Sequence, residues 1–397
     1  MTSLISPTPA TRSTTTPTTA APRQLLPSDT PMALITADGE LADEITLTMP
    51  EPEVLLALYR GIVLGRRFDT QATALTKQGR LAVYPSSRGQ EACQIGATLA
   101  MREQDWLFPT YRDSMAVVAR SVDPVEVLAL LKGDWHCGYD PYLHRVAPQC
   151  TPLATNTLHA VGLAHAAKIK SEDTVALAML GDGATSEGDT HEALNFAAVW
   201  NSPVVFLVQN NGYAISVPLS KQSAAPSLAH KGIGYGVASM RVDGNDPAAV
   251  YAATRLAIKA AAGGGGPTLI EAMTYRMEAH TNADDATRYR LGSEVQTWLA
   301  RDPLARLEHY LRAVATLDDA TAEQIAAEAE TQAASLRERM NADVEHDPSE
   351  LFEYVYAQPT ATLRVQQAQL AAELAAELDG TAELHDTAEL HDVDEQP

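Results

Sequence analysis

Residues 174–213 have the sequence TVALAMLGDGATSEGDTHEALNFAAVWNSPVVFLVQNNGY, in which two short apolar runs enclose a segment long enough for a helix. The runs Thr174–Leu180 and Val204–Val208 are bounded by turn residues, which is typical of buried parallel strands. Together with Thr190–Trp200 between them, they predict a β–α–β unit. A third run, Thr268–Ala272, continues the alternation. The sequence therefore predicts an α/β fold with a doubly wound, mostly parallel sheet flanked by helices.

Composition divides the 397 residues into three parts. Residues 1–50 are rich in Thr and Pro, which predicts a disordered tail and linker. Residues 51–357 contain the predicted α/β domain and its helical C-terminal region. Residues 358–397 predict a helix and then an acidic disordered tail, in which TAELHD occurs twice. We interpret His385 and His391 of these repeats as solvated residues rather than metal ligands.

The charge balance and the terminal sequence limit the compartment and the partners. A formal net charge of −22 argues against binding to nucleic acid or to an anionic membrane surface. The three cysteines form no CxxC pair, which favours a reducing compartment. No apolar run is long enough to span a bilayer. The first thirty residues lack an apolar signal core and have only Arg12 and Arg23 as cations. We expect a bacterial cytoplasmic protein rather than one of the mitochondrial matrix.

A polar turn follows each strand of the predicted β–α–β unit. Gly181-Asp182-Gly183 comes after the first strand, and Asn210-Asn211-Gly212-Tyr213 comes after the second. Ligands of open α/β sheets bind at the carboxyl ends of strands, which lie side by side in parallel neighbours. Asp182 and Asn211 can therefore meet at one ion. A carboxylate, an amide oxygen and a main-chain carbonyl suit Mg²⁺, with phosphate oxygens completing its shell. The glycines and the next helix N-terminus favour close approach of a phosphate.

This pair of turns, joined across one β–α–β unit, is the fingerprint of thiamin-diphosphate enzymes. Residues from about 51 to 357 resemble the alpha subunit of the E1 component of 2-oxo acid dehydrogenases, most closely the branched-chain type. The matching segments are GDGATSEGD (181–189), ALNFAA (193–198), NNGYAIS (210–216), RVDGND (241–246), LIEAMTYR (269–276) and DDATRYR (284–290). The resemblance implies a thiamin-diphosphate-binding fold, a heterotetramer of two alpha and two beta chains, and a cofactor at each alpha–beta contact.

The resemblance also implies the residues of the site. The Mg²⁺ ligands are the side chains of Asp182 and Asn211 and the main-chain oxygen of Tyr213. Arg112 offers the diphosphate a bidentate guanidinium fork. The implied contacts with the cofactor are Tyr111, Arg112, Thr151, Leu153, Gly181, Asp182, Gly183, Ala184, Asn211, Tyr213, Ala214, Arg276 and His280.

His280 stands at the position of the family's catalytic histidine, and an imidazole can exchange a proton near neutral pH. Three nearby features depart from the family's pattern. Ala279 occupies a position where some relatives have a second histidine. Thr281 replaces the serine that kinases phosphorylate in mitochondrial relatives. Gln209 stands where branched-chain relatives have an arginine, so one phosphate contact is weaker or replaced.

Two further segments raise the question of other ions. Cys150–Asn156 resembles a loop that lines the substrate pocket and in some relatives binds K⁺, through backbone carbonyls and Thr155. Asn156 stands where a longer glutamine is frequent. Residues 135–137 (Trp-His-Cys) and His144 lack any recognised zinc-ligand spacing, so we interpret them as a packed loop.

The implied reaction is the oxidative decarboxylation of pyruvate or a branched-chain 2-oxo acid, with the acyl group passed to the lipoyl arm of an acyltransferase. Half of the active site, including a glutamate, would come from the beta subunit, so the chain should be inert alone. An acetoin dehydrogenase of the same build and a non-catalytic assembly subunit remain as alternatives. A plain nucleotide-binding protein is disfavoured because the only dense glycine run, Gly263–Gly266, precedes a strand.

Overall fold

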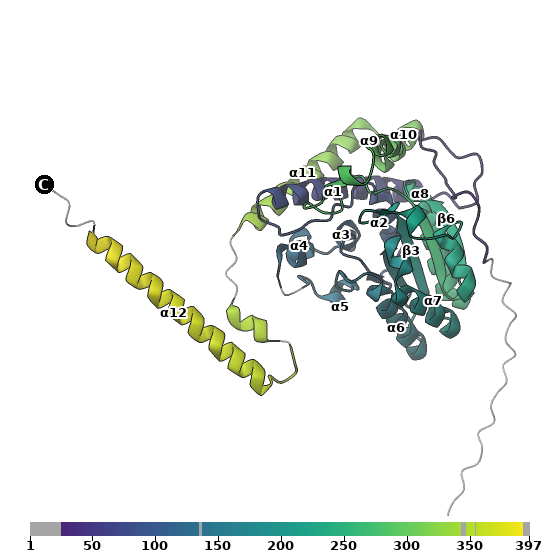
Figure 1. The fold of residues 1–397 in the computed structure, drawn as a ribbon. Helices are drawn as coiled ribbons and strands as arrows, with labels where there is room; N and C mark the ends of the chain where they lie inside the picture. Colours follow the sequence, from purple (N-terminus) through teal and green to yellow (C-terminus); the bar gives the residue numbers. More distant parts are fainter. Residues whose placement is uncertain (1–24, 135–136, 343–346, 354, 392–397) are drawn as a thin grey trace, which may run out of the picture. The chain divides into compact units, whose positions relative to one another are not determined.

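The computed structural model describes residues 25–134, 137–342, 347–353 and 355–391, with side chains placed up to residue 377. The chain divides into two compact units, Met1–Arg337 and Glu338–Pro397. The first unit contains the sheet (Figure 1). The domain boundaries at residues 50 and 357 stay predictions.

The central sheet has five parallel strands in the order β1-β2-β3-β7-β6. Its strands are β1 (Trp106–Phe108), β2 (Ala176–Gly181), β3 (Val204–Asn210), β6 (Ala238–Asp243) and β7 (Thr268–Met273). The register places Gly181 beside Gln209 and Asn210 beside Met273. The turns that follow β2 and β3 therefore leave the sheet at the same edge. A short antiparallel pair, β4 (Tyr213–Ala214) and β5 (Val217–Pro218), follows β3 directly.

Helices account for most of the remaining described chain. The α-helices are α1 (Pro52–Lys77), α2 (Glu91–Leu99), α3 (Ser114–Ala119), α4 (Pro124–Lys132), α5 (Pro141–His144), α6 (Thr155–Lys170), α7 (Gly188–Trp200), α8 (Pro247–Ala260), α9 (Gly292–Leu299), α10 (Pro303–Ala313), α11 (Asp319–Asn341) and α12 (Ala361–His391). The 3₁₀ helices are η1 (Gly183–Ser186), η2 (Leu219–Lys221), η3 (Leu228–Tyr235), η5 (Ala286–Arg288) and η6 (Pro348–Phe352), and η4 (Ala261–Gly265) is a π-helical turn.

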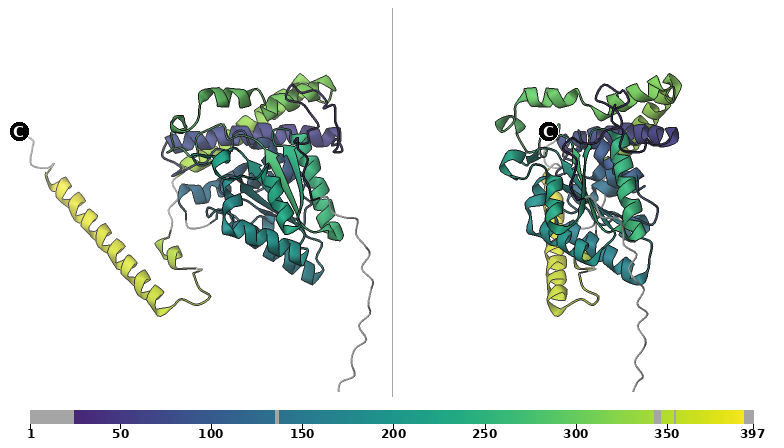
Figure 2. Two further views of the ribbon diagram at one scale, coloured as in Figure 1. Left: turned by 45° about the vertical axis from the view of Figure 1, so that its right-hand side comes forward. Right: turned by 90° about the vertical axis from the view of Figure 1, so that its right-hand side faces the viewer.

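Helices cover both faces of the sheet (Figures 1 and 2). Helices α6 and α7 pack together on one face, whereas α2 and α8 pack together on the other, with α1 outside α2. The apolar cluster under α6 and α7 includes Val161, Leu194, Phe206 and Val208, each almost fully buried. This arrangement buries the central strands on both sides, as their continuous apolar sequence requires.

The structure confirms the predicted fold class. The runs at 174–180, 204–208 and 268–272 become β2, β3 and β7, and the helix predicted at 190–200 is α7. Strands β1 and β6 were not predicted. The first has only three residues, and the second is an edge strand in which buried and half-buried residues are mixed.

The start of α8 is stabilised by its capping residue and by a proline in the first turn. Asp246 caps α8 by accepting hydrogen bonds from the main-chain N–H groups of Ala248 and Ala249, and Pro247 occupies the first turn. Both features satisfy or remove N–H groups that a helix start leaves without a partner. The second carboxylate oxygen of Asp246 accepts from the N–H groups of Leu34 and Ile35. This one buried carboxylate therefore joins the N-terminal segment to the start of α8.

Two sequence interpretations concern ions outside the main site. The side chains of His385 and His391 and the residues Trp135 and His136 lie outside the described residues. Cys137 donates from its thiol to the main-chain oxygen of Tyr139. Across the part of the chain that the structure describes, no group of three or more His, Cys, Asp or Glu side chains is placed to hold a metal ion.

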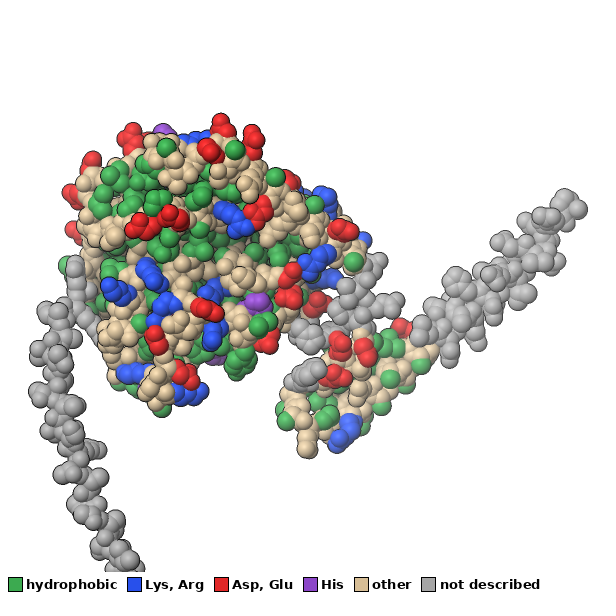
Figure 3. Space-filling view, turned by 180° about the vertical axis from the view of Figure 1, so that it is seen from behind, with side chains coloured by type: hydrophobic (Ala, Val, Ile, Leu, Met, Phe, Trp, Pro, Cys, Tyr) green, Lys and Arg blue, Asp and Glu red, His purple; other side chains and the backbone are tan. Residues whose placement is uncertain are grey.

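The surface of the first unit carries charges of both signs. Figure 3 shows basic and acidic side chains interspersed around apolar areas on one face. None of the helices among the described residues is long and apolar enough to cross a membrane.

Candidate active site

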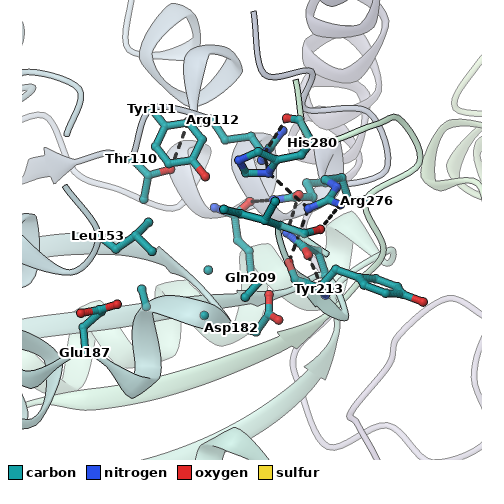
Figure 4. A pocket seen from close by; sticks show the side chains of 17 residues that line it. Thr110, Tyr111, Arg112, Leu153, Asp182, Glu187, Gln209, Tyr213, Arg276 and His280 are labelled. Atoms are coloured by element: carbon teal, nitrogen blue, oxygen red, sulfur yellow. Dashed lines mark hydrogen bonds between the residues drawn. The ribbon is translucent and has the colours of Figure 1, made fainter. Parts of the chain in front are cut away.

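An open cavity of about 180 Å³ lies at the carboxyl ends of β2 and β3. Figure 4 shows side chains from several elements converging on it. The residues singled out from the sequence that line it are Tyr111, Arg112, Leu153, Gly181, Asp182, Gly183, Ala184, Asn211, Tyr213, Ala214, Arg276 and His280. Thr151 is exposed and does not line this cavity. Twelve of the thirteen implied contacts are thus brought together from distant parts of the chain.

Oxygen atoms suited to a divalent cation gather at the floor of the cavity. Asp182 is buried, and its Oδ2 accepts a 2.7 Å hydrogen bond from Nε2 of Gln222. Oδ1 of Asn211 accepts from the main-chain N–H of Tyr213 at 3.2 Å. Burial raises the pKa of Asp182, and the hydrogen bond from Gln222 opposes this change. A carboxylate in this condition gains from a cation, because burial penalises its uncompensated charge.

The backbone around these oxygens is close-packed. A Cβ atom on Gly183 would lie 2.7 Å from Cβ of Ala214. Gly212 has a φ of +86°, in the left-handed region that favours glycine. Both glycines therefore allow the turns after β2 and β3 to approach one another. The donor set and the tight glycine turns fit a bound Mg²⁺–diphosphate.

Two buried guanidinium groups also line the cavity, and Nη1 of Arg276 donates to the main-chain oxygen of Tyr213 at 3.5 Å. Arg112 donates from Nη1 to the main-chain oxygen of Ser86 at 2.9 Å. Arg276 donates from Nη2 to the main-chain oxygen of Ile215 at 2.7 Å and to the hydroxyl of Tyr289 at 2.9 Å. Among the described residues neither guanidinium forms an ion pair with a carboxylate. Burial, and then the charge of Arg112, lowers the pKa of Arg276. The cavity therefore carries positive charge that an anion would neutralise.

His280 lies between these two arginines (Figure 4). Its Nδ1 is 3.0 Å from Nη2 of Arg112 and 3.4 Å from Nη1 of Arg276. Because arginine only donates, Nδ1 must accept, and the neutral ring carries its proton on Nε2. Burial, followed by the charges of Arg112 and Arg276, lowers the pKa of His280 to about 4. The imidazole is therefore neutral at pH 7 and offers an N–H donor.

The loop that contains His280 is fixed by its own hydrogen bonds. The main-chain N–H of His280 donates to Oδ2 of Asp284 at 2.8 Å, and the hydroxyl of Tyr289 donates to the same oxygen atom. The ring of Tyr111 meets the imidazole edge to face, with centroids 6.1 Å apart. These contacts hold the imidazole at the cavity without blocking its Nε2.

The segment Cys150–Asn156 forms another side of the cavity through Leu153, which is 41% exposed. The hydroxyl of Thr155 donates to Asp189 at 3.0 Å. The amide of Asn156 donates to the main-chain oxygens of Phe108 and Met179. The loop is therefore closed by protein hydrogen bonds at the two side chains considered for K⁺, and K⁺ binding stays a prediction.

A model of the family described as the dehydrogenase E1 component matches residues 59–349. The chain belongs to the dehydrogenase E1 component family. It is 47% identical over 346 residues to the 3-methyl-2-oxobutanoate dehydrogenase subunit alpha of Mycobacterium tuberculosis (strain ATCC 25618 / H37Rv), covering 87% of this chain and 94% of that protein.

Two other relatives are pyruvate dehydrogenase E1 component alpha subunits. The one from Acholeplasma laidlawii is 37% identical over 334 residues, covering 83% of this chain and 96% of that protein. The one from Staphylococcus aureus (strain N315) is 38% identical over 280 residues, covering 70% of this chain and 75% of that protein. The resemblance seen in the sequence is confirmed, and with it the interpretation of the chain as an E1 alpha subunit of a 2-oxo acid dehydrogenase. Membership of the E1 family implies dependence on thiamin diphosphate.

Several residues of the E1 cavity were missed in the sequence. Gln90, Thr110, Glu187 and Ile215 line it, and so does Gln209, noted in the sequence only as a departure from the family. Gln90 precedes α2, far from the fingerprint in sequence, so tertiary packing alone brings it to β3. The other three are next to or near residues that the motifs identified, and neighbouring position was the available signal.

Proposed function

We propose that this E1 alpha chain binds Mg²⁺–thiamin diphosphate in the cavity at the ends of β2 and β3, and acts with a beta chain on a branched-chain 2-oxo acid. The observation that carries the proposal is one cavity lined both by buried oxygen ligands and by two buried guanidinium groups that form no ion pair with a carboxylate. A cation and a polyanion together would neutralise both sets of groups.

The residues that this chain contributes to the proposed site have distinct tasks. Asp182, Asn211 and the main-chain oxygen of Tyr213 hold Mg²⁺. Arg112 and Arg276 hold the diphosphate oxygens. The chemistry that thiamin diphosphate supplies when bound is a nucleophilic carbon and an electron sink for the loss of CO₂.

His280 acts as the proton donor near the substrate, because its Nδ1 is occupied by arginine donors and its Nε2 carries the proton. Its pKa of about 4 keeps the ring neutral. The negative charge of a diphosphate would offset the two arginines and raise this pKa toward neutral, which improves proton transfer. Leu153 and Ile215 supply apolar surface to the same cavity.

The partners are proposed from the relatives and the open form of the cavity. Relatives named as alpha subunits point to a beta chain, and an alpha₂beta₂ assembly would close the site and supply the rest of the substrate pocket. The acyl group would then pass to a lipoyl arm of an acyltransferase. The chain is 47% identical to the relative named for 3-methyl-2-oxobutanoate and 37% identical to the pyruvate dehydrogenase relative of Acholeplasma laidlawii. The higher identity supports a branched-chain substrate over pyruvate.

The test is calorimetric titration of thiamin diphosphate with Mg²⁺ into the full chain co-expressed with a beta chain. Asp182→Ala should abolish binding. Asp173→Ala is the matched control, because Asp173 precedes β2 at the opposite edge of the sheet and is mostly exposed. Faster turnover of 3-methyl-2-oxobutanoate than of pyruvate would support the branched-chain substrate, and the reverse would contradict it. Absence of binding in the unmodified complex would contradict the site and favour an assembly role.

A further inference from the structure

A series of four buried polar side chains connects α3 to the metal-facing edge of the cavity. Nε2 of Gln209 donates to Oδ1 of Asp113 at 2.6 Å. Nε2 of Gln90 donates to Oε1 of Gln209 at 3.0 Å. Nδ2 of Asn211 donates to Oε1 of Gln90 at 3.1 Å. All four side chains are at most 6% exposed, so water cannot replace a broken link at low cost.

The direction of this series is set at one end. Oδ2 of Asp113 accepts from both the main-chain N–H and the hydroxyl of Thr110, each at 2.7 Å. An ionised carboxylate can only accept, so Gln209 must turn its nitrogen toward Asp113. Gln209 then offers its oxygen to Gln90, and Gln90 offers its oxygen to Asn211. Each amide has one possible orientation once the first is fixed.

The other end of the series is the proposed metal ligand. With Nδ2 of Asn211 committed to Gln90, Oδ1 is left to face the cavity, where it also accepts from the N–H of Tyr213. An amide nitrogen cannot coordinate Mg²⁺, which takes oxygen ligands. Whether Asn211 presents oxygen or nitrogen therefore decides whether the site can hold the ion.

We propose that Asp113 is a positioning residue for the metal site, acting through Gln209 and Gln90 to hold Asn211 with its oxygen toward Mg²⁺. The proposal rests on the Mg²⁺ site of the proposed function. It also gives Gln209 a task in this chain. The series transmits orientation over three hydrogen bonds, and low surrounding polarity strengthens each bond.

Asp113→Asn tests the proposal because it reverses the preferred direction. The main-chain N–H of Thr110 can only donate, so the oxygen of the new amide must stay there and its nitrogen must turn to Gln209. Gln209 and Gln90 would follow. The nitrogen of Gln90 would then face Asn211, which must either leave two N–H groups opposed or turn its own nitrogen toward the metal and against the main-chain N–H of Tyr213. Both results weaken Mg²⁺ binding.

The decisive measurement is a double-mutant cycle with Asn211→Asp, read out as the Mg²⁺ dissociation constant by calorimetry at saturating thiamin diphosphate. A carboxylate at 211 has two oxygens, so it can accept from a reversed Gln90 and still face the metal. In the single Asn211→Asp variant, the oxygen of Gln90 opposes a carboxylate. We expect Asp113→Asn to weaken Mg²⁺ binding at least tenfold. The double variant should bind at least tenfold more tightly than the two single effects combined would give.

Control variants separate an effect on the orientation of the Asn211 amide from a general loss of folding. Asp246→Asn replaces another fully buried carboxylate, whose own partners are main-chain N–H groups away from the cavity, and should leave Mg²⁺ affinity unchanged. If Asp113→Asn fails to fold, Gln90→Met cuts the link nearest Asn211 and should weaken Mg²⁺ binding severalfold.

The outcomes separate the two proposals. If the wild-type complex and the Asp113→Asn variant bind Mg²⁺ equally well, the positioning role is overturned and the metal site stands. The same holds if the two effects in the double-mutant cycle simply add. No Mg²⁺ binding by the wild-type complex would overturn the metal site, and the positioning role with it.

Discussion

Replacing Arg112 by methionine should weaken thiamin diphosphate binding by roughly 150-fold. A guanidinium has five N–H groups. Three of them donate to the main-chain oxygen of Ser86 and to Nδ1 and the main-chain oxygen of His280, which leaves two for an anion. A hydrogen bond to a charged group contributes about 1.5–3 kcal/mol, so losing two costs about 3 kcal/mol at the lower limit. Each 1.36 kcal/mol is a factor of ten, which gives the estimate of roughly 150-fold.

The same change should raise the pKa of His280 in the free protein. Burial is the largest cause of its low pKa of about 4, and the charge of Arg112 is the next, so the pKa rises but stays below 6.5. Calorimetry measures the affinity, and NMR titration of the imidazole measures the pKa. Arg88→Met is the control, because Arg88 is a half-exposed arginine paired with Glu278 at 4.0 Å. An affinity within threefold of the wild type, or an unmoved His280, would refute the assignment of Arg112 to both tasks.

Three further changes test other parts of the structure. Because the pKa of His280 falls from 6.5 unfolded to about 4 folded, the unfolded state binds more protons between these values. The stability from this residue is therefore present above pH 6.5 and lost toward pH 4; His280→Gln should flatten that part of the urea midpoint–pH curve, and an unchanged slope would contradict the shift. Gln222→Leu removes the amide donor to buried Asp182 and should cost the free chain about 1–3 kcal/mol in thermal unfolding; no loss would mean that water serves the carboxylate. Phe206→Ala empties a fully buried position in β3 and should cost about 3–5 kcal/mol in denaturant unfolding, whereas a cost under 1 kcal/mol would mean the core collapses around it.

The local pattern of apolar residues was sufficient to predict the central strands of the sheet. Strands β2 and β3 are apolar without interruption up to Leu180 and Val208, because helices cover both of their faces. Edge strand β6 contains Arg241, which pairs with buried Glu271 at 3.3 Å. A charged residue whose partner is on another strand cannot be recognised as part of a strand from its own neighbours. Three-residue β1 is too short for any periodicity.

The residues of the site likewise divide into those that the sequence predicts and those that it does not. Asp182 and Asn211 were identified because each follows an apolar strand in a known motif. Gln90, before a helix, accepts from the amide nitrogen of Asn211, and Gln222, in the segment after β5, donates to a carboxylate oxygen of Asp182. Their positions depend on how distant segments pack, and neither has a motif of its own. The direction of the amide series likewise follows from three-dimensional hydrogen bonding, which sequence alone does not contain.

The two buried, unpaired arginines have a kinetic consequence in a chain with a net charge of −22. A diphosphate approaching from a distance meets an overall repulsive field, and it meets attraction only inside the cavity. Salt screens interactions between exposed charges beyond a Debye length of about 8 Å at physiological ionic strength, while buried charges are screened much less. Raising the salt concentration should therefore speed association of the anionic cofactor with this chain and leave its dissociation rate almost unchanged, the opposite of the usual behaviour of an anion at a basic site.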